Sequence, residues 1–79
     1  MFYYTYVLKS LKDGDLYTGY SEDLQKRKKE HDLGLVTATK NRRPLILVYY
    51  EACGNKNRAI EREKYFKTGF GRRYLKNRI

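Results

Sequence analysis

The feature that most constrains the fold of this chain is the turn signal Asp13-Gly14, which lies between two segments of strand-forming residues. The first segment is residues 2–10 (FYYTYVLKS) and the second is residues 15–20 (DLYTGY). Aromatic and β-branched side chains favour strands, and an Asp-Gly pair favours the tight turn of a hairpin. The sequence therefore predicts an antiparallel β-hairpin over these two segments.

The length of the hairpin loop decides which side chains share a face of the sheet. If residues 11–14 form the loop, Tyr6 lies opposite Gly19, and Leu8 lies opposite Tyr17. The two tyrosines are then diagonal neighbours on one face, within reach of each other. A two-residue turn keeps them on the same face but further apart, and only a one-residue slip would separate them. Gly19 leaves an open position beside Tyr6, where another backbone or a ligand can approach.

A basic helix is predicted directly after the hairpin. Ser21 is the expected N-cap, and Gly34 is expected to end the helix. At about 100° per residue, Arg27 lies roughly 60° and His31 roughly 20° from Leu24, the residue expected to face inward. The arginine and the histidine are therefore predicted on the side of the helix that faces the sheet.

Three further elements are predicted in the rest of the chain. Residues 45–52 (LILVYYEA) are a continuous apolar run, typical of a strand covered on both faces that lies centrally or beside the first strand. Residues 54–67 predict a second helix, capped near Asn55 or Asn57. After a glycine-rich break, residues 68–79 predict a short basic helix against the sheet. The residues of that helix expected to point inward are Tyr74, Leu75 and Ile79.

Glu63 is a carboxylate within the apolar side of the second predicted helix. On a helical wheel it falls roughly 40° from Ala59 and roughly 60° from Phe66, whereas Glu61 points to solvent. A carboxylate on a packing face is destabilising unless it is paired or binds a metal ion. Two interpretations stay open: a buried salt bridge to Arg27 or a nearby lysine, and a ligand for a divalent cation.

The charge of the chain points to a polyanionic partner. Eighteen Lys plus Arg stand against nine Asp plus Glu, a net charge of +9. On so small a surface this field favours nucleic acid as the partner, through contacts to its phosphates. A solvated run of charges is the alternative. The cations expected to contact DNA are Lys40, Arg42, Arg43, Arg72 and Arg73.

Length and composition narrow the class of protein. Residues 1–79 are expected to form one small domain, and no apolar run approaches the roughly 20 residues that span a bilayer. Met1 leads directly into a strand-like segment rather than a signal peptide, so a cytoplasmic protein is expected. Cys53 is the only cysteine, which excludes an intramolecular disulfide or a cysteine zinc site, and it is expected to be buried.

Five side chains offer the groups that hydrolysis of a phosphodiester needs. Tyr6 and Tyr17 are phenols that a neighbouring metal ion or lysine can shift toward phenolate, and His31 can accept or relay a proton. Arg27 presents a planar fork for phosphate oxygens. Glu63 can hold one Mg²⁺-like ion, with water in the remaining positions. The chain has no nucleotide-binding glycine loop, no HExxH motif and no Ser-His-Asp candidate.

These residues resemble the motifs of the GIY-YIG nuclease superfamily, specifically its small single-domain bacterial members. Residues 4–6 (YTY) stand where that family has GIY, and residues 17–19 (YTG) stand where it has YIG. Arg27 matches the helix arginine eight residues after the YIG glycine, and His31 matches the His or Tyr four residues further on. Residues 59–67 (AIEREKYFK) resemble the second-helix motif. The resemblance extends over nearly the whole chain.

The resemblance implies an α+β fold, with a three-stranded antiparallel sheet flanked by helices. It also implies hydrolysis of one DNA strand with a single Mg²⁺ or Mn²⁺ ion, held by Glu63 rather than Glu61. Tyr6 or Tyr17 would serve as the base or the partner of the metal-bound water, and Arg27 would stabilise the transition state.

The sequence departs from the family pattern at three places. The first triplet keeps only its final tyrosine. Tyr20 stands where some relatives carry a lysine thought to help activate the base, which leaves that role to His31. Asn77 is the nearest match to a late asparagine of some relatives.

The expected function is a structure-selective or weakly specific DNA endonuclease in repair or recombination. One alternative is a nucleic-acid-binding module with an inactive nuclease site. Another is a basic accessory protein whose charge serves a ribosomal or protein partner.

Overall fold

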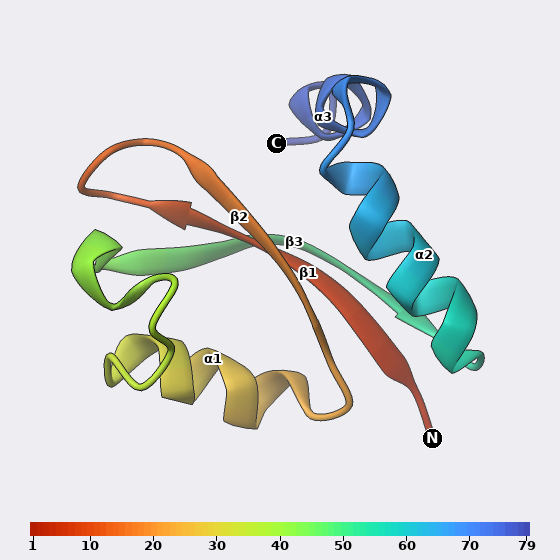
Figure 1. Ribbon diagram of the computed structural model, residues 1–79, viewed down its shortest axis with the longest axis horizontal. Helices are drawn as coiled ribbons and strands as arrows, with labels where there is room; N and C mark the ends of the chain where they lie inside the picture. Colours follow the sequence, from red (N-terminus) through yellow and green to blue (C-terminus); the bar gives the residue numbers. More distant parts are fainter.

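The computed structural model describes residues 1–79 and contains one sheet with helices on both of its faces (Figure 1). The strands pair antiparallel in the order β2-β1-β3. This is the predicted α+β architecture. None of the helices is long and apolar enough to cross a membrane. In chain order the elements are β1 (Tyr3–Ser10), β2 (Leu16–Ser21), α1 (Leu24–Asp32), the 3-10 helix η1 (Lys40–Arg42), β3 (Leu45–Cys53), α2 (Lys56–Phe66) and α3 (Gly69–Lys76).

The hairpin of β1 and β2 has the register expected for a four-residue loop. Tyr6 lies opposite Gly19, and Tyr17 lies opposite the residue two positions after Tyr6 on β1. The Ser10 N–H donates to the Asp15 carbonyl at 2.9 Å, which closes the loop. The first of the two predicted turn lengths is therefore confirmed.

Alternate side chains of β1 point to opposite faces of the sheet, and different helices cover each face. Tyr6 and Leu8 lie in a cluster on the α1 face. Val7 lies in a second cluster on the other face, with Phe66 of α2 and Leu75 of α3. β1 is thus the central strand between two separate hydrophobic clusters.

The start of α1 differs from the prediction by two residues. Asp23, not Ser21, caps the helix, because its Oδ1 accepts the N–H of Lys26 at 3.1 Å. Ser21 still belongs to β2, and its Oγ accepts the N–H of Asp23 at 3.0 Å. The helix ends just before Gly34, whose φ of +76° is the left-handed conformation that commonly follows a helix. The predicted end is therefore confirmed.

Two contacts hold α2 in place against the sheet. The Thr5 hydroxyl of β1 donates to the Ala59 carbonyl at 2.7 Å. The Arg62 Nε–H donates to the Glu51 carboxylate of β3, at 2.8 and 3.0 Å from its two oxygens. Because neighbouring helix residues point about 100° apart, Glu63 does not follow Arg62 toward β3.

The prediction that β3 is covered on both faces is wrong. The strand lies beside β1, one of its two predicted positions, but Ile46 and Leu47 are 42% and 36% exposed. These two neighbouring side chains point to opposite faces of the sheet, so both faces of β3 are partly open. Cys53 ends this strand and is half-buried rather than buried.

The two C-terminal helices follow the predicted pattern with one exception. Asn55 caps α2, since its Oδ1 accepts the Arg58 N–H at 3.1 Å. Leu75 of α3 is 1% exposed and packs inward as predicted. Ile79 was predicted to pack inward but is 46% exposed, because α3 ends at Lys76 and its helical spacing does not continue.

Candidate active site at the edge of β2

The candidate site is built around Tyr6, whose ring lies against the backbone of Gly19. Tyr6 is 1% exposed. A Cβ atom at residue 19 would overlap the Cζ and Oη atoms of Tyr6. Glycine at this position is therefore what lets the phenol cross from β1 to the edge strand β2.

Tyr6 is the first member of a buried chain of three hydrogen-bonded side chains. Its Oη lies 2.8 Å from Nε2 of His31, and the Nδ1 of His31 lies 2.7 Å from Oγ1 of Thr39. His31 and Thr39 are both fully buried. Both nitrogens of the imidazole are thus bonded within the protein, which fixes the orientation of the ring.

Tyr17 completes an aromatic group on the same face of the sheet. Its ring centre lies 6.5 Å from that of Tyr6 and 5.3 Å from that of His31. Tyr17 is half-buried, whereas the other two rings are buried. The predicted register and the predicted helix face therefore bring the two phenols and the imidazole together.

Arg27 lies one turn before His31 on α1 and reaches the same phenol. The nearby Tyr6 phenol is the main reason that the pKa of Arg27 is raised. Arg27 also pairs with Glu30 at 3.1 Å. Its side chain is 36% exposed, so part of the guanidinium remains accessible to an anion from solvent.

Burial sets the protonation states of Tyr6 and His31. It raises the pKa of the Tyr6 phenol, and the Arg27 guanidinium opposes that rise. It lowers the pKa of the His31 imidazole, and the positive charge of Arg27 lowers it further. At neutral pH the phenol is therefore protonated and the imidazole uncharged, so that one of its nitrogens can accept a proton.

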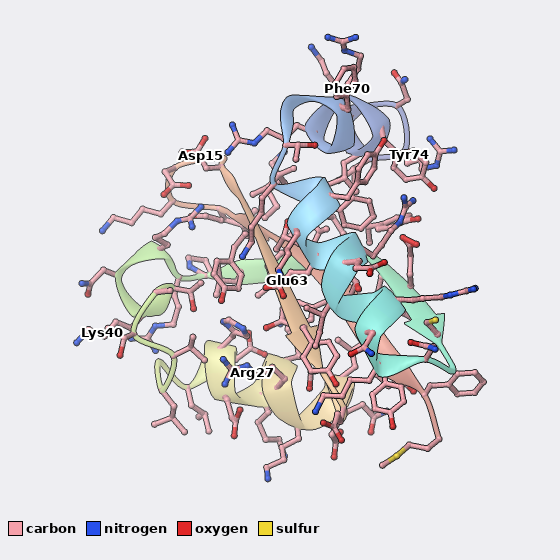
Figure 2. The ribbon with its side chains drawn as sticks, turned by 45° about the vertical axis from the view of Figure 1, so that its right-hand side comes forward. Asp15, Arg27, Lys40, Glu63, Phe70 and Tyr74 are labelled. Carbon is pink, nitrogen blue, oxygen red and sulfur yellow. The ribbon has the colours of Figure 1, made fainter.

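Glu63 approaches this group from the opposite face of the sheet. Figure 2 shows Glu63 on α2 and Arg27 on α1, on either side of β2. Burial is the main cause of the raised pKa of Tyr6, but the negative charge of Glu63 adds to it, so the carboxylate lies within electrostatic reach. Four of the five residues predicted for catalysis, Tyr6, Tyr17, Arg27 and His31, therefore gather on the α1 face, whereas Glu63 lies on α2, which covers the other face.

The ion pair of Glu63 is with a lysine of its own helix. Its Oε2 lies 3.1 Å from Nζ of Lys67, whose side chain is 55% exposed. The sequence left open a buried salt bridge or a ligand for a divalent cation. An ion pair with a lysine is present, but it is exposed to solvent on the lysine side. An exposed i,i+4 pair is worth about 0.3–0.5 kcal/mol, too little to prevent the carboxylate from binding another cation.

The donor set at Glu63 suits a hard, largely hydrated cation. No group of three or more His, Cys, Asp or Glu side chains is arranged to hold a metal ion. Mg²⁺ is commonly bound through one or two carboxylates, with waters and substrate phosphates completing its octahedron. A half-buried carboxylate beside an open strand edge fits this kind of binding, with Glu63 as the protein ligand.

The cations of the loop before β3 are partly engaged within the protein. Arg42 pairs with Asp13 at 3.1 Å. Arg43 donates to the Lys40 carbonyl at 2.9 Å, and its guanidinium packs on Gly34. These two arginines hold the loop as well as adding positive charge to the surface.

The arginines of α3 are less engaged within the protein than Arg42 and Arg43. Arg72 and Arg73 are exposed and take part in no ion pair. Arg72 also lines a cavity of about 290 Å³ beside Tyr17 and Lys67. Among the predicted DNA contacts, Arg72 therefore has the clearest connection with the candidate site.

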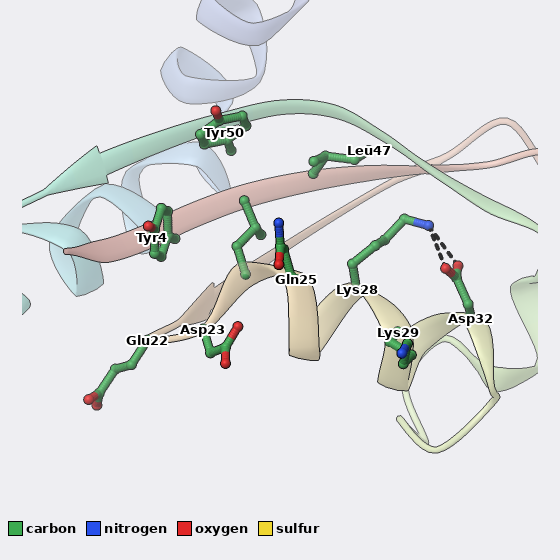
Figure 3. Close-up of a pocket in the computed structure, with 10 residues that line it drawn as sticks. Tyr4, Glu22, Asp23, Gln25, Lys28, Lys29, Asp32, Leu47 and Tyr50 are labelled. Atoms are coloured by element: carbon green, nitrogen blue, oxygen red, sulfur yellow. Dashed lines mark hydrogen bonds and ion pairs between the residues drawn. The ribbon is translucent and has the colours of Figure 1, made fainter. Parts of the chain in front are cut away.

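A larger groove lies on another side of α1 and contains none of the five predicted catalytic residues. It has a volume of about 720 Å³ and lies between α1 and the exposed side chains of Leu47 and Tyr50 (Figure 3). The ion pair of Lys28 and Asp32, at 2.7 Å, lies along its wall. The candidate site is therefore distinguished by its chemistry rather than by its volume.

Thr39 is the member of the site that the sequence analysis missed. It lies in a basic loop without hydrophobic periodicity, where no pattern marks one threonine over another. Of the positions where the sequence departs from the family pattern, Tyr20 pairs with Thr5 and so faces away from Tyr6. Asn77 is exposed and follows the end of α3.

Comparison with known proteins identifies the family. Residues 2–77 match the GIY-YIG catalytic domain. A UPF0213 protein of Staphylococcus saprophyticus is 44% identical over 75 residues, which cover 94% of this chain and 90% of that protein. A UPF0213 protein of Bacillus pumilus is 46% identical over 67 residues, which cover 84% of this chain and 67% of that protein.

A solved structure agrees with these matches. The solution NMR structure of a UPF0213 protein from Bacillus halodurans is similar with a TM-score of 0.60 and 34% identity, over 98% of this chain and 84% of that one. Its similarity spans all the elements that carry the candidate site. The chain therefore belongs to the GIY-YIG family, among the small bacterial UPF0213 proteins.

Proposed function

We propose that this protein is a metal-dependent endonuclease that hydrolyses one phosphodiester bond of DNA. The observation that carries the proposal is the 2.8 Å contact between Tyr6 Oη and His31 Nε2, with Arg27 beside the same phenol. Membership of a nuclease family supports the type of reaction. The net charge of +9 supports a polyanionic substrate.

Tyr6 is the proposed general base, because it is the phenol bonded to His31. Its oxygen accepts a proton from the attacking water while its own proton passes to Nε2 of His31. The oxygen of the attacking water bonds to phosphorus as the bond between phosphorus and the leaving oxygen breaks. The leaving oxygen then takes a proton from solvent. Coupling the two transfers avoids a free phenolate, which the burial of Tyr6 disfavours. Tyr17 is placed to orient the water.

Arg27 and Glu63 act on the phosphate rather than on the proton. Arg27 donates from the exposed part of its guanidinium to the non-bridging oxygens, where negative charge grows in the transition state. Glu63 would hold one Mg²⁺ or Mn²⁺ ion, which when bound supplies a Lewis acid for the phosphate. The contacts that hold α2 to β1 and β3 keep the Glu63 backbone at a fixed distance from the phenols.

The proposed substrate is branched or otherwise structured DNA of the kind that repair and recombination produce. The exposed arginines of α3 are suited to phosphates, which position a protein on DNA without reporting its sequence. Weak sequence specificity and a steep loss of affinity with salt are therefore expected. DNA shape, rather than base identity, would then select the site of cutting.

The test compares two carboxylates of the same helix. Glu63→Gln is expected to reduce nicking of flap, junction and duplex DNA in Mg²⁺ or Mn²⁺ by about 100-fold or more, with binding within about twofold of wild type. Glu61→Gln is the matched control, since Glu61 is exposed on α2, and it is expected to cut normally.

Three outcomes would contradict this proposal. Nicking by Glu63→Gln in buffer with a chelator would remove the role given to the carboxylate. Wild-type protein that binds these DNAs without cutting any of them would favour a nucleic-acid-binding module with an inactive site. Equal binding to heparin and DNA, without cutting, would favour a basic accessory protein.

A further inference from the structure

We propose that Thr39 is a positioning residue that holds His31 in one tautomer, with its proton on Nδ1 and with Nε2 free to accept the proton of Tyr6. The catalytic consequence rests on the proposed nuclease function. The tautomer itself is a property of the folded protein and can be measured without any activity. The inference starts from the buried chain of 2.8 Å and 2.7 Å contacts that joins the three side chains.

Hydrogen bonds can run along this chain in either of two directions. A neutral imidazole has one N–H donor and one nitrogen acceptor, so its two bonds must point the same way along the chain. In the first direction Tyr6 donates to Nε2 and Nδ1–H donates to Thr39. In the second direction Thr39 donates to Nδ1 and Nε2–H donates to Tyr6.

Arg27 selects the first direction. A guanidinium can only donate, and Arg27, one turn before His31 on α1, acts on the Tyr6 phenol with its positive charge. In the second direction the phenol oxygen would accept from His31 while facing the charge of Arg27, and the phenol hydrogen would lose the acceptor that Nε2 provides. In the first direction the phenol hydrogen is bonded to Nε2, and the oxygen keeps its lone pairs free to face the positive charge of Arg27.

Thr39 supplies the acceptor that this tautomer needs at Nδ1. The threonine is fully buried, and its N–H bonds the Val36 carbonyl at 3.1 Å, which fixes the turn that carries it. A buried N–H without an acceptor is strongly disfavoured. Without the Thr39 hydroxyl, the imidazole would therefore carry its proton on Nε2, where it blocks transfer from Tyr6.

The charged and titratable groups around His31 do not replace this acceptor. Those of α1 act on the imidazole through their charge, and the rings of the two phenols pack against it in T-shaped contacts. Only the threonine hydroxyl is hydrogen-bonded to Nδ1. The groups in question are Arg27, Lys28, Glu30 and Asp32 of α1, Tyr6 of β1 and Tyr17 of β2.

The first experiment reads the tautomer from the nitrogen and carbon chemical shifts of the imidazole by NMR at neutral pH. His31 is the only histidine, so its signals are assigned without ambiguity. Wild type and Thr39→Ser are expected to carry the proton on Nδ1. Thr39→Val, which has a similar shape but no hydroxyl, is expected to carry it on Nε2.

Two NMR results would overturn the inference: the Nε2–H tautomer in wild type, or an unchanged tautomer in Thr39→Val. If Thr39→Val does not fold, the wild-type and Thr39→Ser spectra decide the question. Thr37→Val is the matched control, since Thr37 is an exposed residue of the same loop, and it should leave the tautomer unchanged.

The second experiment follows nicking. Thr39→Val is expected to lower kcat by about 10- to 100-fold with little change in KM, as for other residues that orient a reacting group. Thr39→Ser is expected to cut within about threefold of wild type, and Thr37→Val normally. Unchanged kcat in Thr39→Val would remove the catalytic part of the inference. Wild-type protein that does not nick DNA would refute the proposed nuclease function. The assignment of the His31 tautomer by NMR would not be affected by that result.

Discussion

Tyr6 and Gly19 face each other across β1 and β2, and the phenol of Tyr6 fills the space that a side chain at residue 19 would occupy. Gly19→Ala is therefore expected to displace the phenol from His31. We expect nicking to fall at least about tenfold, and the free energy of unfolding to fall by about 1–3 kcal/mol as in other overpacked sites. Nicking assays and urea unfolding measure the two effects.

Gly54→Ala is the control for this prediction. A Cβ atom at residue 54 would meet no atom within 4 Å, and its backbone needs no left-handed conformation. We expect Gly54→Ala to cut and unfold like wild type. Normal cutting by Gly19→Ala would show that the phenol is not needed where the structure places it.

Arg27→Lys tests whether the fork of the guanidinium matters beyond its charge. A lysine keeps the positive charge but cannot bond Tyr6, Glu30 and a phosphate with a planar set of donors. We expect nicking to fall about 100-fold with DNA binding little changed, measured by nicking and by fluorescence anisotropy. Arg58→Lys is the control, because Arg58 is exposed on α2 and in no ion pair.

The stability of the protein is expected to fall as the pH drops below about 6.5. Burial lowers the pKa of His31 below its ordinary value of 6.5, which it regains in the unfolded chain. Between these two values the unfolded state binds a proton that the folded state does not, so the free energy of unfolding decreases. Above about pH 6.5 neither state binds that proton, and the contribution is complete.

Urea unfolding between about pH 8 and pH 5 checks this prediction. His31→Gln lacks the titration and should give a flatter dependence on pH over the same window. Equal slopes for wild type and His31→Gln would mean that the histidine binds protons equally well in the folded and unfolded states.

DNA binding is expected to depend more on Arg72 than on Arg42. Arg72 is exposed and unpaired, whereas Arg42 already pairs with Asp13. Each lost phosphate contact lowers the slope of log K against log salt by about 1. We expect this change for Arg72→Ala and a smaller one for Arg42→Ala, in titrations at several salt concentrations. The reverse order would place the DNA on the loop side of the molecule.

The hairpin and the phenol pair could be predicted because short-range rules determine them. The Asp13-Gly14 turn limits the register to few choices, and a strand period of two then decides the face of Tyr6 and Tyr17. In the same way, a helical period of 3.6 was enough to prefer Glu63 over Glu61. In each case neighbours within one element or one hairpin supply the information.

Thr39 and the exposure of β3 could not be predicted, because they depend on how distant elements pack. The loop that carries Thr39 has no period, and its contact with His31 appears only once α1 lies against the sheet. The apolar run of β3 looks the same whether its faces are covered or open. Its exposure follows from how little the helices cover it rather than from its own residues.

The two hydrophobic clusters of the sheet share no side chain, one lying under α1 and the other under α2 and α3. Substitutions at Leu8 and at Phe66 should therefore change the free energy of unfolding almost independently. The two faces of the sheet could thus be engineered separately. The α1 face, with Tyr6 and His31, can stay unchanged while the cluster under α2 and α3 is repacked for higher thermal stability.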